Sequence, residues 1–315
     1  MKKIILSLLI LSLFFGIFAG NVAAQDDPSV GFVVKSLANE YWIIVRAGAR
    51  NRAEELGVDL NFIAPNSESD ISTQIQMIEN LVGSGVDALS IAPSSPDAVQ
   101  STLDLAAEEG IKLLAVDTDF SHEAKLTFIG TGNKAAAKQG AEYAMEQLGS
   151  DVNAIILRGR LGDETHDQRE AGIVEGLEEN GAEILEIQAA DSEAERALNV
   201  TQNLLQRYFD VNLIIATNDG MAQGAQRAVE AANLTDQVSI MGFDGTVPVA
   251  EMTADGMFLG TVAQDPYKMG QLGVEKAVEA INGKEIEERI DSGVRIITPE
   301  NALEYIEEID EQLGN

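Results

Sequence analysis

One pattern repeats along most of the chain: a short apolar run, a polar loop, and then a segment with apolar residues every three or four positions. In the first copy, Ser29–Val34 is apolar and rich in β-branched residues, and an amphipathic segment runs from Tyr41 to Leu56 before Gly57. A continuous apolar run suits a strand covered on both faces, and glycine commonly ends a helix. This stretch predicts a strand, a loop and a helix of a parallel sheet.

The same unit recurs to the end of the chain. Further strands are predicted at 58–63, 86–91, 111–116, 126–129, 153–157, 183–187, 212–216, 238–241 and 257–262. Further helices are predicted at 70–81, 96–109, 134–148, 168–179, 193–207, 221–232, 247–254, 266–282 and 302–313. Alternating strands and helices are typical of α/β folds with parallel sheets. Since these units exceed one five- or six-stranded sheet, we expect two similar doubly wound lobes that face each other across a cleft.

The first 24 residues read as a cleavable signal peptide rather than as part of the fold. Met1–Lys3 is basic, Ile4–Ala19 is apolar, and Val22–Ala24 offers small residues for cleavage, so the mature chain is expected to begin near Gln25. An uncleaved anchor helix is the alternative. No later stretch is long and apolar enough to span a bilayer.

Composition narrows the functional classes. The chain has no cysteine, which excludes disulfides, zinc–thiolate sites, a cysteine nucleophile and a lipid-carrying cysteine. We therefore expect an exported protein of the periplasm that is not a lipoprotein. The formal charge of −31 disfavours binding to nucleic acid or anionic lipid, and suits a salt-loving source, although an ordinary acidic secreted protein is also possible.

Polar residues gather where the predicted strands end. Ligands of open parallel sheets bind at these carboxyl ends, and here the residues are carboxylates, amides, cations and aromatics. Such groups suit a neutral polyhydroxylated ligand, whose hydroxyls both donate and accept hydrogen bonds and whose C–H faces pack on aromatic rings. No nucleophile has a positioned base, and His122 and His166 have no partner at metal-ligand spacing. We expect no catalytic residue, no metal and no cofactor.

Six segments in order resemble the ribose-binding family of periplasmic sugar-binding proteins, which deliver monosaccharides to ABC importers. The match runs over essentially all of the mature chain and is strongest at 33–42, 88–93, 198–205, 217–222, 241–246 and 262–264. The resemblance implies a type I periplasmic binding protein with two Rossmann-like lobes and a three-strand hinge. It implies a first lobe of 25–131 plus 265–293 and a second of 132–264 plus 294–315. The chain would then act as a monomer that docks on a membrane permease.

The resemblance also implies which side chains contact the ligand. In the first lobe these are Asn39, Tyr41, Trp42, Asp117 and Thr131; in the second lobe and hinge they are Arg169, Asn218, Asp244 and Gln264. Lys35, which follows the first strand, is expected to join the first-lobe contacts. Residues that differ from the ribose pattern are Lys35 for a small hydroxyl residue, Ala92 for an amide, Thr118 for an arginine and Ser192 for an aromatic. These differences favour another sugar or a sugar alcohol over ribose.

Other residues near the strand ends have simpler interpretations. Asp219 is expected to cap a helix, and His122 and His166 are expected on the surface. Arg169 is expected to make a buried contact, although Asp167 and Glu170 are possible partners on its own helix. Arg158, Arg160 and Asp163 are weaker candidates for the cleft.

Two alternatives remain open at this point. The same fold serves ligand-presenting receptors for chemotaxis or for a furanose-like signalling molecule. A more distant alternative is an NAD-dependent oxidoreductase, because 130–135 satisfies the loose dinucleotide pattern G-x-G-x-x-A. That segment lies far from the first strand–helix turn, where the nucleotide fold places it, and no strand-end acidic residue follows about 20 positions on. A sugar-responsive repressor is disfavoured by the export signal and the charge.

Overall fold

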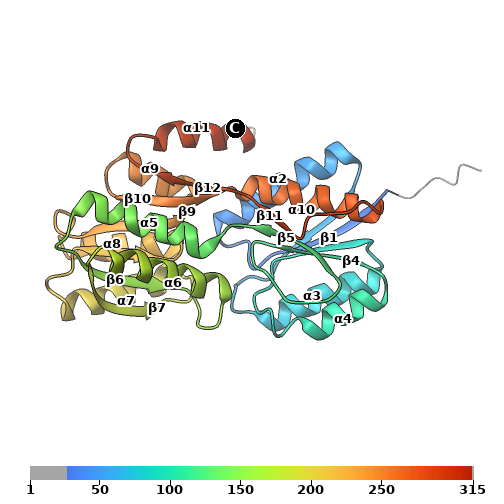
Figure 1. The fold of residues 1–315 in the computed structure, drawn as a ribbon, viewed down its shortest axis with the longest axis horizontal. Coiled ribbons are helices and arrows are strands. Elements are labelled where there is room, and N and C mark those ends of the chain that lie inside the picture. The colour runs from blue at the N-terminus through green and yellow to red at the C-terminus, as the bar shows by residue number, and fades with distance from the viewer. Residues whose placement is uncertain (1–26, 314–315) are drawn as a thin grey trace, which may run out of the picture.

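The computed structural model describes residues 27–313 and contains two six-stranded sheets, each at the centre of a lobe (Figure 1). The predicted signal peptide lies outside the described residues. None of the helices between residues 27 and 313 has the length and hydropathy needed to cross a membrane.

The first lobe is built on the sheet β11-β5-β4-β3-β1-β2, in which the pairings are parallel. Its strands are β1 (Ser29–Val33), β2 (Asp59–Ile63), β3 (Ala88–Ile91), β4 (Lys112–Val116), β5 (Lys125–Gly130) and β11 (Arg289–Asp291). Helices α2 (Glu40–Leu56) and α10 (Pro266–Ile281) cover one face, and α3 (Ile71–Ser84) and α4 (Gln100–Glu108) cover the other (Figure 1). Each face buries its own apolar cluster, so the central strands are apolar on both sides.

The second lobe repeats this order with the sheet β12-β10-β9-β8-β6-β7. Its strands are β6 (Asn153–Arg158), β7 (Glu183–Ala189), β8 (Leu213–Ala216), β9 (Ser239–Asp244), β10 (Gly260–Gln264) and β12 (Val294–Ile297). Helices α5 (Asn133–Leu148) and α6 (Glu164–Glu179) cover one face. The other face packs mainly against α7 (Ala194–Arg207) and α8 (Asp219–Ala231), with a contribution from α9 (Val247–Ala254).

The two longest helices of the first lobe approach each other closely. A Cβ at Gly48 of α2 would lie 2.0 Å from the carbonyl oxygen of Tyr267, and one at Gly270 of α10 would lie 2.0 Å from that of Val45. Only glycine permits this contact between backbones. Because α10 follows the second-lobe strand β10, its packing on α2 ties the hinge firmly to the first lobe.

The chain passes between the sheets three times, at β5 to α5, at β10 to α10 and at β11 to β12 (Figure 1). Strand β12 is antiparallel to β10, whereas β11 is parallel to β5. The C-terminal helix α11 (Ala302–Leu313) packs on α9, and its cluster with Tyr305 and Ile309 reaches Ile44 of α2. Helix α11 therefore makes an apolar contact with the first-lobe helix α2 beside the hinge.

Some predicted boundaries were wrong. Helix α6 begins at Glu164 rather than at residue 168, and α4 begins at Gln100 rather than at residue 96. Strand β10 spans Gly260–Gln264, whereas the prediction was 257–262. The ends of helices and strands are set by helix capping and by strand pairing, and the sequence pattern indicates these less clearly than it indicates the apolar core.

Candidate functional site

The carboxyl ends of both sheets meet at one cavity between the lobes. Its lining takes in most of the predicted contact residues together with three others: Lys35, Asn39, Tyr41, Trp42, Glu68, Asp117, Thr165, His166, Arg169, Asn218 and Asp244. Most of these side chains are buried, with only Asn39 and Glu68 partly exposed. Side chains from segments far apart in the sequence thus surround one small space, as the strand-end pattern predicts.

On the first-lobe side, helix α2 directs its first residues into the cavity. Asn39 is the N-cap of α2 and accepts a hydrogen bond from the backbone N–H of Tyr41 at 3.0 Å. The Tyr41 hydroxyl donates to Asp117 Oδ1 at 2.8 Å. Asp117 follows β4 with φ at 62°, a conformation that is strained for a residue with a Cβ. In this backbone conformation the carboxylate of Asp117 points toward Tyr41 and the cavity.

The remaining first-lobe groups form a polar rim beside the indole ring. Trp42 Nε1 donates to Glu68 Oε1 at 3.1 Å, and burial raises the pKa of the Glu68 carboxyl. Burial opposes the charge on Lys35, but Asp163, Asp117 and Glu68 together raise its pKa above the ordinary value. Lys35 is therefore a buried cation held by carboxylates.

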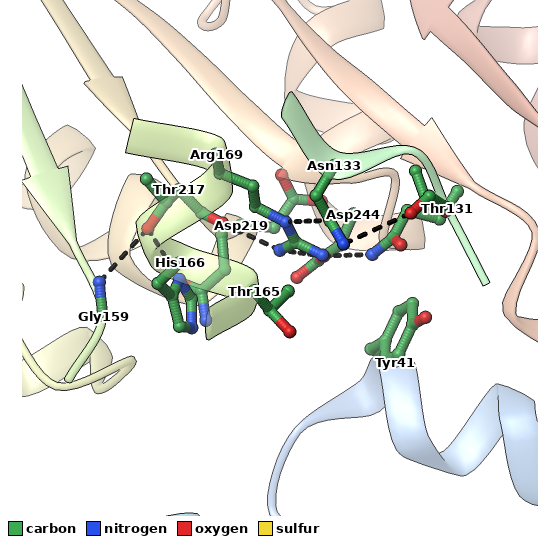
Figure 2. Close-up of polar contacts among 12 residues, drawn as sticks. Tyr41, Thr131, Asn133, Gly159, Thr165, His166, Arg169, Thr217, Asp219 and Asp244 are labelled. Atoms are coloured by element: carbon green, nitrogen blue, oxygen red, sulfur yellow. Dashed lines mark hydrogen bonds and ion pairs between the residues drawn. The ribbon is translucent and has the colours of Figure 1, made fainter. Parts of the chain in front are cut away.

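On the second-lobe side, Arg169 is the centre of a buried network (Figure 2). Its Nε donates to Asn133 Oδ1 at 2.8 Å, and its Nη1 donates to the Thr217 carbonyl at 2.9 Å and to Asp244 Oδ1 at 3.0 Å. The guanidinium also lies 3.9 Å from the centre of the Phe243 ring. The predicted buried contact is therefore present, and the fixed fork of arginine suits it.

Asp244 is the acidic partner of this network. It follows β9 with φ at 129°, and it accepts a hydrogen bond from Gln264 Nε2 at 2.8 Å. Burial raises the pKa of its carboxyl, although the contact with Arg169 acts in the opposite direction. Gln264 is absent from the cavity lining and supports the site through Asp244.

Thr131 also lies just outside the cavity lining. It is buried at the first crossing, where its hydroxyl is 3.3 Å from Ser292 Oγ and its carbonyl accepts from Asn133 Nδ2 at 3.4 Å. The 130–135 segment that fits the loose dinucleotide pattern is thus a hinge crossing tied to Arg169 through Asn133.

Three direct contacts join the lobes around the cavity. Lys35 Nζ lies 3.0 Å from Asp163 Oδ2, and both side chains are buried. The hydroxyls of Thr118 and Thr165 lie 2.9 Å apart, and Arg160 donates to the carbonyl of Ser94. Arg160 and Asp163, which ranked low as cleft residues, therefore hold the two lobes together.

The cavity is small in this closed arrangement, at about 20 Å³. That volume suits about one water molecule. A larger ligand enters only when the lobes separate and side chains such as Lys35 move. Lobe opening is therefore part of any binding reaction at this site.

The structure contradicts two interpretations of single residues. Asp219 is not a helix cap: Asn218 caps α8, and Asp219 is fully buried, accepting from Thr246 and Thr261. His166 is not a surface residue. It is 4% exposed and lies between Thr217 and Ser192, with each hydroxyl 2.8 Å from a ring nitrogen.

Other candidates pair away from the cavity. Arg158, rather than Arg169, pairs with Asp167 and Glu170. His122 is a partly exposed residue 3.2 Å from Asp104 and lies outside the site. Within residues 27–313, no group of three or more His, Cys, Asp or Glu side chains has the arrangement needed to hold a metal ion.

Burial of His166 predicts a pH dependence of stability. Burial lowers the pKa of its imidazole to about 3, against the opposing effect of Asp163. Between pH 6.5 and 3 the unfolded chain binds a proton here that the folded chain does not, so stability falls as the pH falls. The expected loss is about 1.4 kcal/mol per pH unit, or about 2 kcal/mol from pH 7 to 5.

Denaturant unfolding of the wild type and of His166→Gln at both pH values measures this loss. The variant is expected to be less stable than the wild type at pH 7. It should also lose less unfolding free energy between pH 7 and 5, because it lacks the imidazole. Equal losses in the two proteins would contradict the assignment.

Comparison with known proteins identifies the same architecture. A family model for the periplasmic binding protein domain matches residues 30–285. The ribose import binding protein of Haemophilus influenzae is 31% identical over 298 residues, covering 95% of this chain and 100% of the relative. The D-ribose/D-allose-binding protein of Pseudomonas aeruginosa is 30% identical, covering 90% of this chain and 91% of the relative.

Solved structures agree with these relatives. An ABC transporter periplasmic solute-binding protein from Actinobacillus succinogenes, solved with bound D-allose, superimposes with a TM-score of 0.84. It is 29% identical and covers 89% of this chain and 100% of its own.

Proposed function

Because this chain belongs to the periplasmic binding protein family, we propose that it captures a monosaccharide or related polyol between its lobes and delivers it to the permease of an ABC importer. The observation that carries the proposal is the convergence of Asp117, Arg169 and Asp244 on one interlobe cavity. The relatives bind ribose or allose according to their names, and the family consists of solute-binding proteins rather than enzymes.

The cavity chemistry suits such a ligand. Carboxylates accept hydrogen bonds from sugar hydroxyls, while Lys35 and Arg169 donate to them. Tyr41 and Trp42 present rings to the apolar faces of a sugar. Asn39 and Asn218 complete the proposed set of ligand-contacting residues. Thr131 and Gln264, which lie outside the cavity lining, are proposed to support these residues.

Capture works by hinge closure. The open and closed forms differ by a few kcal/mol, so contacts made to a ligand from both lobes shift the population toward the closed form. Closure changes the outer faces of the lobes, which a permease can recognise. The proposed lobes are 25–131 plus 265–293 and 132–264 plus 294–315, as the sequence suggests.

We assign the mature chain to the periplasm after removal of residues 1–24. It works there as a monomer without cofactor or catalytic activity, and it does not bind nucleic acid.

Trp42 provides the direct test. It is the only tryptophan of the chain, and it lies in the cavity lining with Nε1 on Glu68. A sugar that enters displaces neighbours of the indole, so the fluorescence maximum or intensity is expected to change and to saturate. A ligand at 100 times its dissociation constant should also raise the unfolding free energy by about 2.7 kcal/mol.

The measurement is a thermal-shift screen of pentoses, hexoses and polyols, followed by fluorescence titration of each hit. A hit that stabilises the protein without changing the fluorescence of Trp42 would show that the ligand binds outside this cavity. The absence of any hit across the panel would contradict the proposed function.

A further inference from the structure

The charges around the cavity do not balance. Two cations, Lys35 and Arg169, line the cavity with three carboxylates, those of Glu68, Asp117 and Asp244, and Lys35 is also paired with a fourth, Asp163, outside the lining. Lys35 pairs with Asp163 and Arg169 pairs with Asp244. In the described part of the chain, Glu68 and Asp117 have no lysine, arginine or histidine within ion-pair distance.

The partners of these two carboxylates are neutral donors. Asp117, which is 4% exposed, accepts from the hydroxyls of Tyr41 and Thr118 at 2.8 and 2.9 Å. Glu68 accepts from the indole of Trp42. Asp117 is thus a buried carboxylate with only neutral donors, which is stabilised less than one with a cation, whereas Glu68 is partly exposed.

The protonation behaviour of the site agrees with a missing positive charge. Burial raises the pKa values of Glu68 and Asp244. Lys35 lowers that of Glu68 and Arg169 lowers that of Asp244, but neighbouring carboxylates act in the opposite direction, and the pKa of each remains raised. His166 does not supply the charge, because burial keeps its imidazole neutral.

A groove beside the cavity is also lined by negative charge. A groove of about 530 Å³ shares Asn39 and Glu68 with the cavity, and no described lysine or arginine lines it. Its other acidic residues are Glu40 and Glu193, together with Asp191 and Glu195, which pair with Arg196 and Arg227. Such a groove concentrates cations near the site and repels anions.

We propose that the preferred ligand is a cationic sugar, an amino sugar whose protonated amine lies between Glu68 and Asp117. This inference rests on the proposed function and narrows its ligand class. The amine would supply the charge that the two carboxylates lack, while the ring hydroxyls use Lys35, Arg169 and the amides. Sugar acids and phosphorylated sugars are excluded by the same charges.

The test compares ligands that differ only at the amine. Calorimetry at pH 7 on the purified mature protein uses glucosamine, galactosamine and mannosamine as probes, each against its parent hexose. At least one amine is expected to bind tenfold or more tightly than its parent, since a charge-assisted hydrogen bond is stronger than a neutral one. Higher salt should reduce this preference.

Two variants locate the amine. Glu68→Gln keeps an acceptor for Trp42 but removes the charge, so the amine preference should fall about tenfold. Glu178→Gln, at the exposed far end of α6, removes the same charge away from the cavity and should leave the preference unchanged.

The outcomes separate the two claims. Tight binding of a neutral sugar, with its amine equal or weaker, would overturn the cationic ligand and leave the sugar-binding function intact. Failure of every amine and every neutral sugar to bind would overturn both.

Discussion

Replacing Arg169 with alanine is expected to weaken sugar binding at least thirtyfold, a loss of about 2 kcal/mol or more. The guanidinium makes contacts of 2.8–3.0 Å to Asn133, Thr217 and Asp244, and it is 3% exposed. The variant leaves Asp244 buried without its cation, and breaking a buried pair in this way costs about 3–5 kcal/mol. The substitution is therefore expected to lower both the ligand affinity and the stability of the second lobe.

Calorimetry on folded protein separates these effects, with circular dichroism melting as the check on folding. Asp244→Asn, which keeps the shape of the side chain, should also lose affinity and provides a second variant if Arg169→Ala does not fold. Arg207→Ala is the matched control, because Arg207 pairs with Glu186 on the exposed surface of the same lobe. Unchanged affinity in both site variants would remove this network from the site.

The second large effect is expected at the pair that joins the lobes. Lys35 and Asp163 lie 3.0 Å apart with side-chain exposures of 3% and 5%, and burial of both depends on closure. Lys35→Met leaves Asp163 buried and uncompensated in the closed form, so closure should become less favourable by about 3 kcal/mol. Ligand affinity should fall and the average shape in solution should become more open.

A double-mutant cycle isolates the pair. Asp163→Asn keeps a good N-cap for α6 while removing the charge, and it should weaken closure as Lys35→Met does. The double variant should recover part of the loss, because no buried charge is left unpaired. Small-angle scattering with and without sugar reports the opening, and Lys125→Met, which breaks a pair within the first lobe, is the control. Additive losses in the cycle would show that the pair does not act as a unit.

The sequence predicted the fold well because its core strands are continuous apolar runs. Such runs as Ile214–Ala216 are buried on both faces, and their periodicity is unambiguous. The strands β11 and β12 were missed as strands, although a crossing was expected near Gly293. They are short and largely exposed, so neither carries an apolar signal.

The site was predictable only in part, for a similar reason. The resemblance named Asp117, Asp244 and Arg169 as ligand contacts, and all three line the cavity. Glu68 was missed because it lies in the loop after the edge strand β2. Thr165 and His166 were missed because the polar first turn of α6 gave no periodic signal, so the helix was predicted to begin too late.

Pairings between side chains that are distant in the sequence could not be predicted from it. Lys35 and Asp163 are 128 positions apart, and nothing local marks them as partners. Likewise, Asp219 follows a strand as a cap would, and only the fold shows that Thr246 and Thr261 surround it.

The central claim is that both lobes close on a single small carbohydrate. The most direct measurement is a crystal structure of the mature protein with the tightest-binding sugar from the panel. The account predicts that the sugar lies between the two sheets and hydrogen-bonds to Asp117 from one lobe and to Asp244 or Arg169 from the other. A sugar bound to one lobe alone, with Asp117 and Asp244 both free of it, would contradict the account.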